Sequence, residues 1–76
     1  MNESDVRSVI AESVPGFDVS TLGLESEFDK SGIDSLDHSV ILLGLQEKHG
    51  LVVPDEDLDQ ANSIGKILAY AAKRSG

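Results

Sequence analysis

The chain has 76 residues, no cysteine, and 14 acidic against six basic side chains, which gives a formal net charge of −8 at pH 7. A chain of this length folds as one domain over residues 1–76, with a modest core and no room for a deep catalytic cleft. The lack of cysteine excludes disulfides and thiolate metal sites, and the acidic charge disfavours binding to nucleic acid or anionic membranes.

The first apolar pattern predicts a helix from about residue 3 to residue 14. Its apolar residues are spaced as one helical face: Val6, Val9, Ile10 and Val14. Asn2 or Ser4 is the expected N-cap, and Pro15-Gly16 ends the helix. Residues 16–33 then form a long connection without sustained periodicity. We expect its apolar residues to hold it against the helices: Phe17, Val19, Leu22, Leu24 and Phe28.

A second helix is predicted from Ser35 to about His49, with Gly50 after its end. Gly32 permits a sharp turn before the helix, and Asp34 can cap exposed backbone N–H groups. Ser35 therefore projects outward at the first turn. Apolar residues cover more than half of this helix, so part of it should face a partner or ligand. They form one stripe of His38, Ile41, Leu42, Leu45 and His49 and another of Leu36, Val40 and Leu43. We expect His49 to pack at the edge of the core.

Two further helices follow. The first is short and begins at Pro54-Asp55-Glu56-Asp57-Leu58, with proline at its first turn. The last has Ser63 as its cap and ends with Lys73-Arg74, and its apolar residues are Ile64, Ile67, Leu68, Ala71 and Ala72. The expected fold is all-α: a small four-helix bundle with three longer helices, one short one, and a long loop between the first and second.

Three rival sites can be weighed from the residues. Asp55, Asp57 and Asp59 imitate the start of a calcium loop, but Gln60 and Lys66 replace the glycine and glutamate that such a loop needs. Only weak divalent-cation binding stays open there, the other possibility being a solvated acidic face.

Two further pairs of side chains fail for separate reasons. His38 and His49 would lie roughly 16 Å apart on a helix, too far to share one zinc ion. Ser35 and His38 are one turn apart, but no orienting acid, nucleophile-elbow pattern or oxyanion pocket accompanies them, so we expect no enzymatic activity.

The segment Gly32-Ile33-Asp34-Ser35-Leu36-Asp37, followed by a Leu-rich helix, Gly50 and Pro54-Asp55-Glu56, resembles the acyl carrier protein family over nearly the whole chain. The resemblance implies that Ser35 carries 4′-phosphopantetheine, transferred from coenzyme A by a phosphopantetheinyl transferase. It also implies that the thiol of this arm holds acyl groups as thioesters while the carrier visits biosynthetic enzymes. The transferase would supply the base and the metal, and Asp34 would help to orient the modification site.

The same resemblance implies a docking surface on the second helix for acyl-loading and acyl-processing enzymes with basic surfaces. Its apolar centre would be Leu36, Val40 and Leu43, with Asp37 and Glu47 as its charged edge; for Val40 and Leu43 the alternative is a place in the core. No apolar run approaches the roughly 20 residues that span a bilayer, and Met1 to Asp5 is not a basic secretory signal. We therefore expect a cytoplasmic monomer.

The cargo and pathway stay open. Carriers of bacterial fatty acid synthesis typically have a densely acidic second helix, whereas here only Asp37 and Glu47 are acidic between Ser35 and Gly50. Fatty acid, polyketide and specialised lipid pathways all fit. Two other functions also fit the sequence: an aminoacyl or peptidyl carrier, and an unmodified acidic scaffold or regulatory module.

Overall fold

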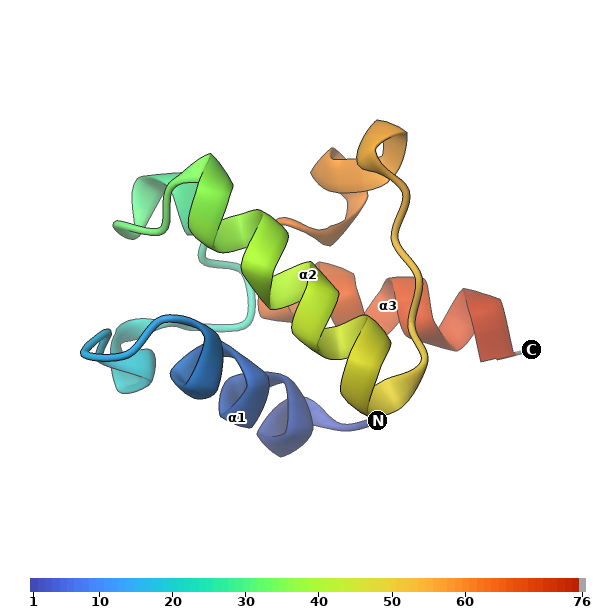
Figure 1. The fold of residues 1–76 in the computed structure, drawn as a ribbon, viewed down its shortest axis with the longest axis horizontal. Coiled ribbons are helices and arrows are strands. Elements are labelled where there is room, and N and C mark those ends of the chain that lie inside the picture. The colour runs from blue at the N-terminus through green and yellow to red at the C-terminus, as the bar shows by residue number, and fades with distance from the viewer. Residues whose placement is uncertain (76) are drawn as a thin grey trace.

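The computed structural model describes residues 1–75, and for Ser75 the backbone only. Within this range the chain is helical, and its elements follow in this order: α1 (Glu3–Ser13), η1 (Val19–Thr21), η2 (Phe28–Lys30), α2 (Ser35–His49), η3 (Asp55–Ala61) and α3 (Ile64–Ser75). The η elements are short 3₁₀ helices. α1 packs against both α2 and α3, and η3 packs against α3 (Figure 1). The predicted small four-helix bundle with a long first loop is confirmed.

The helix boundaries agree with the capping signals in the sequence. Asn2 caps α1 through a capping box, in which its Oδ1 accepts from the Asp5 N–H while the Asp5 carboxylate accepts from the Asn2 N–H, both at 2.9 Å. Ser4 lies inside the helix and is not the cap. Ser63 Oγ accepts from the Lys66 N–H at 3.2 Å at the start of α3. Gly50 follows α2 in the left-handed conformation, with φ at 69°.

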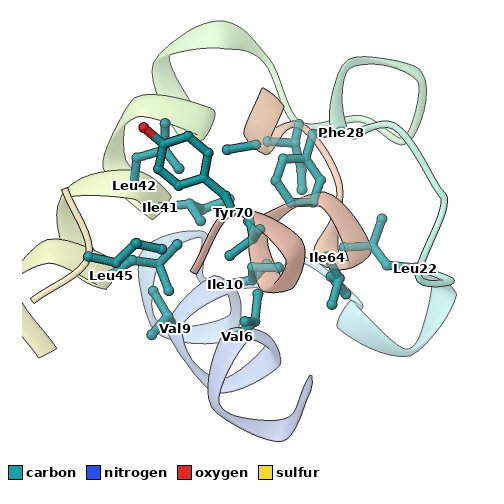
Figure 2. Close-up of a cluster of buried hydrophobic side chains, with 14 residues drawn as sticks. Val6, Val9, Ile10, Leu22, Phe28, Ile41, Leu42, Leu45, Ile64 and Tyr70 are labelled. Carbon is teal, nitrogen blue, oxygen red and sulfur yellow. The ribbon is translucent and has the colours of Figure 1, made fainter. Parts of the chain in front are cut away.

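The core lies where the three longer helices and the first loop meet (Figure 2). Each longer helix contributes a buried stripe, and the loop adds Leu22 and Phe28. The Phe28 side chain is only 1% exposed. The residues labelled in Figure 2 are Val6, Val9, Ile10, Leu22, Phe28, Ile41, Leu42, Leu45, Ile64 and Tyr70.

α1 and α2 approach closely at a glycine that the apolar pattern did not single out. A Cβ atom built on Gly44 would lie 2.9 Å from Val9 Cγ1 and 3.2 Å from Ser13 Oγ. A side chain at this position would require Val9 or Ser13 to shift in a closely packed contact.

Two side chains depart from their predicted places. His49 is exposed, because the chain turns at Gly50 and the buried Leu51 occupies the core edge instead. The Leu24 side chain is 45% exposed, so it does not hold the loop. The backbone of Leu24 does, since its carbonyl accepts from the Gly65 N–H at 2.8 Å.

The short third helix is present, but it is a 3₁₀ helix, and Pro54 precedes it rather than opening its first turn. Side chains on neighbouring helices hold η3 in place. The Tyr70 hydroxyl of α3 donates to Asp57 Oδ2 at 2.8 Å, and Arg74 donates to the same hydroxyl at 2.7 Å. The interaction with Tyr70 raises the pKa of Arg74.

On the last helix, Ala71 is half-buried and Ala72 is exposed.

The excess of acidic charge should make folding stability depend on salt. Ion pairs on this surface such as Lys30 with Glu27 are exposed and add little stability. We expect the melting temperature to rise as ionic strength increases from about 0.01 M to about 0.15 M, because the Debye length falls from about 30 Å to about 8 Å and self-repulsion is screened. Calorimetry in sodium chloride and in choline chloride measures this. A melting temperature that stays flat in both salts would contradict it.

Candidate functional site

Ser35 is the first residue of α2 and is exposed. The preceding residues fix its position. Ile33 is buried, and its N–H donates to the Phe28 carbonyl at 3.0 Å, so the end of the loop is anchored immediately before the helix. Gly32 has φ at 95°, a left-handed conformation that glycine adopts at little cost. The chain therefore turns sharply at Gly32, enters the core at Ile33 and emerges at Ser35.

Asp34 caps α2, as predicted. Its Oδ1 accepts from the Asp37 N–H at 2.8 Å, and its carbonyl accepts from the His38 N–H at 2.9 Å. Within residues 1–75 the N–H groups of Ser35 and Leu36 have no hydrogen-bond partner. The first turn of α2 thus presents an exposed hydroxyl beside two free donors at the positive end of the helix dipole, which suits a covalently attached phosphate.

Replacing Asp34 with alanine should destabilise the protein by about 0.5–2 kcal/mol, because the Asp37 N–H loses its acceptor. Urea unfolding followed by circular dichroism measures the difference. Asp29 to alanine is the matched control, since Asp29 is an exposed acid near the same site without a capping hydrogen bond. Equal stability of the two variants would show that the cap contributes nothing.

His38 connects α2 to the end of η3. Its Nε2 lies 2.8 Å from the Ala61 carbonyl oxygen, to which it donates, and its ring meets Phe28 edge-on with centroids 5.2 Å apart. Nε2 of His38 is therefore the donor in a structural hydrogen bond, and within the described residues no hydrogen bond joins the His38 side chain to Ser35. This geometry gives no support to a Ser35–His38 catalytic pair.

A shallow cavity of about 210 Å³ lies beside Ser35, between the end of the loop, the start of α2 and η3. Its lining combines apolar residues with several oxygen-bearing side chains. The lining residues are Asp29, Ile33, Asp34, Ser35, His38, Leu58, Asp59 and Asn62. Three lining residues come from a segment far along the chain: Leu58, Asp59 and Asn62. No local sequence pattern predicts that they share a cavity with Ser35.

The proposed docking residues form one exposed stripe on α2. Leu36 is 72% exposed, Leu43 53% and Val40 39%. Glu47 continues the stripe and is exposed, and Asp37 beside it is half-buried. A place in the core is thus ruled out for Val40 and Leu43, and an unpartnered apolar strip begins next to Ser35.

The acidic residues of η3 do not gather around a common centre. The Asp57 carboxylate is occupied by the Tyr70 hydroxyl and lies 3.3 Å from Gln60 Nε2. In the part of the chain that the structure describes, no group of three or more histidine or acidic side chains is arranged to hold a metal ion. The same part contains no helix long and apolar enough to cross a membrane.

Comparisons with known proteins show which family the chain resembles. Residues 5–71 match the family model described as a phosphopantetheine attachment site. The chain is 36% identical to the acyl carrier protein of Helicobacter acinonychis over 67 residues, which cover 87% of this chain and 85% of that protein. It is 32% identical to the acyl carrier protein of Chlamydia caviae over 75 residues, which cover 97% of this chain and 96% of that protein. For the acyl carrier protein of Clostridium acetobutylicum the identity is 33% over 66 residues, which cover 86% of this chain and 84% of that protein.

These matches extend over most of the chain, including the loop, α2 and η3 that form the site around Ser35. The chain therefore belongs to the acyl carrier protein family, whose members are carriers rather than enzymes and bear covalently attached 4′-phosphopantetheine.

Proposed function

We propose that Ser35 is the attachment point of 4′-phosphopantetheine in this chain, and that the protein carries acyl groups between enzymes of a fatty acid, polyketide or specialised lipid pathway. The observation that carries the proposal is the placement of an exposed hydroxyl at the first turn of a capped helix, beside the free N–H groups of Ser35 and Leu36. When bound, the arm supplies a thiol that forms thioesters. The names of the relatives support an acyl cargo.

The residues around Ser35 fit a phosphate-linked group. The hydroxyl is exposed, and within the described residues no hydrogen bond to its Oγ is found, so modification breaks no hydrogen bond there. Backbone N–H groups at a helix start favour an anion by about 0.3–1 kcal/mol at an exposed position. Asp34 keeps this turn in place through its cap on Asp37. The chain thus provides position and a favourable field, and the transferase provides the base that takes the hydroxyl proton.

The exposed stripe of Leu36, Val40 and Leu43 is proposed as the docking surface for the transferase and for the acyl-processing enzymes. Burying an apolar strip next to Ser35 would bring a partner's active site to the modified residue. The net charge of −8 supports basic partners, because long-range attraction raises association rates without requiring high affinity. A cytoplasmic location is part of the same proposal.

The direct test is to incubate the purified protein with coenzyme A and a broad-specificity phosphopantetheinyl transferase, and then to measure its intact mass. We expect a single increase equal to one 4′-phosphopantetheine. A known acyl carrier protein in a parallel reaction controls for transferase activity. If the control gains mass and this protein does not, the proposal fails.

A further inference from the structure

The His38 side chain joins three segments that lie far apart in the sequence: the start of α2, the end of η3 and the long loop. Its Nε2 donates to the Ala61 carbonyl at 2.8 Å, and its ring meets the Phe28 ring edge-on with centroids 5.2 Å apart. The Phe28 N–H in turn donates to the Asn62 carbonyl at 2.9 Å. We call this arrangement the His38 joint. In it, each of the three segments is held by the other two.

The hydrogen bond from His38 to Ala61 lies in a place with little access to water. Ala61 has no exposed surface, Phe28 is only 1% exposed and His38 is half-buried. An apolar side chain at position 38 would still pack against Phe28, but it would leave the Ala61 carbonyl without its donor, which is costly in a buried place. The imidazole therefore contributes a directed contact in addition to packing.

This contact acts close to the proposed attachment site. Within residues 1–75 it is the only hydrogen bond found between α2 and η3. His38 lies one turn after Ser35, and its N–H donates to the Asp34 carbonyl at 2.9 Å. On the loop side, the Ile33 N–H donates to the Phe28 carbonyl at 3.0 Å. The first turn of α2 is thus held by the loop on one side and by η3 on the other.

A small rotation of α2 would be enough to misplace the hydroxyl of Ser35. Side chains of a helix end about 5–6 Å from its axis, so a rotation of about 10° moves such an oxygen by about 1 Å. A misplacement of 1 Å can lower the rate of a reaction by about 100-fold, because the reacting atoms no longer meet in line. One hydrogen bond that fixes the rotation of α2 can therefore control transfer to Ser35.

We propose that His38 is a positioning residue: its hydrogen bond to the Ala61 carbonyl fixes the rotation of α2 and so places the Ser35 hydroxyl for modification. This inference rests on the proposed function. In that reaction a bond forms between the serine oxygen and the phosphorus that bears the pantetheine. The pyrophosphate bond of coenzyme A breaks, adenosine bisphosphate leaves, and the serine proton goes to a base of the transferase. His38 keeps its Nε2 proton throughout.

The experiment compares wild type with His38→Gln and His38→Asn. Glutamine places an amide N–H at about the reach of Nε2, whereas asparagine is one carbon shorter and falls short of the Ala61 carbonyl. Both variants lose the ring, so the difference between them isolates the hydrogen bond. Ile10→Val controls for stability, because Ile10 is buried in α1 and lies outside the joint. Initial rates of arm attachment are measured against carrier concentration, with saturating coenzyme A and a broad-specificity transferase.

We expect kcat to fall by about 5- to 100-fold in H38N, with KM within about twofold of wild type. KM is retained because the exposed stripe of Leu36, Val40 and Leu43 is unchanged. H38Q and I10V should match wild type in both constants. Residual dipolar couplings of the unmodified proteins measure the orientation of α2 relative to α3. In H38N the first turn of α2 should be rotated by about 10° or more, whereas in H38Q it should not.

Several outcomes would overturn the inference. If H38N has the kcat of wild type, or if its α2 keeps the wild-type orientation, His38 does not position Ser35, although the proposed function stands. An equal fall of kcat in H38Q would assign the effect to the lost ring, and an equal fall in I10V would assign it to stability. If wild type gains no arm while a known acyl carrier protein does, the proposed function fails and the positioning role with it.

His38→Phe replaces H38N if that variant does not fold. It lacks the donor but keeps a ring for the contact with Phe28. The same fall of kcat at unchanged KM is then expected. Failure of both variants to fold would show that the hydrogen bond serves folding alone, and the inference would be wrong.

Discussion

Replacing Ser35 with alanine is expected to abolish the mass increase that coenzyme A and a phosphopantetheinyl transferase produce, without unfolding the protein. The variant removes the nucleophilic oxygen. It should change the free energy of unfolding by less than about 0.5 kcal/mol, because the hydroxyl is exposed and makes no hydrogen bond within the described residues. Intact mass measured after the reaction, with circular dichroism on the same sample, gives both results.

The matched control is Ser39→Ala. Ser39 is an exposed serine one turn further along α2, and its Oγ donates to the Ser35 carbonyl at 3.1 Å. S39A should be modified as wild type is, since the attachment oxygen is intact. A mass increase in S35A would place the attachment elsewhere. Loss of modification in both variants would point to damage to the helix rather than to the loss of one hydroxyl.

Replacing Phe28 with alanine is expected to bring the protein close to unfolding. Phe28 comes from the long loop, is only 1% exposed and packs against the ring of His38. Truncating a buried phenylalanine costs about 3–5 kcal/mol. A domain of 76 residues has a total free energy of unfolding of about 4–11 kcal/mol. The melting temperature should therefore fall by more than about 12 °C.

Function should follow stability in this variant, because the Phe28 backbone also holds Ile33 and Asn62 through hydrogen bonds on either side of the site. Leu24→Ala is the control from the same loop. The Leu24 side chain is 45% exposed, so its truncation should cost much less than that of Phe28. Similar melting temperatures for the two variants would show that the loop is not anchored through Phe28.

The helices were predictable because their signals are local. Asn2, Asp34 and Ser63 act as caps by accepting from an N–H group three residues ahead, a contact that the sequence displays directly. The apolar spacing then indicated which face is buried. The exposed position of Ser35 follows from the same local geometry, so this residue of the candidate site could be predicted from the sequence.

The errors concern contacts between distant segments. His49 has the spacing of a core residue, yet Leu51 occupies that place after the chain turns. Periodicity on one helix cannot show which residue of the next segment competes for the same space. Asn62 lies 27 positions after Ser35 and lines the same cavity, near the point where the His38 side chain of α2 donates to the Ala61 carbonyl at the end of η3. Local sequence patterns therefore could not predict which residues line the cavity beside Ser35.

Peptide mapping of the protein purified from its native host tests the central claim most directly. After protease digestion, mass spectrometry measures the peptide that contains Ser35. We expect this peptide to carry 4′-phosphopantetheine, with or without an acyl group whose mass identifies the cargo. A Ser35 peptide found only with a free hydroxyl, in material protected from phosphodiesterases during purification, would contradict the account.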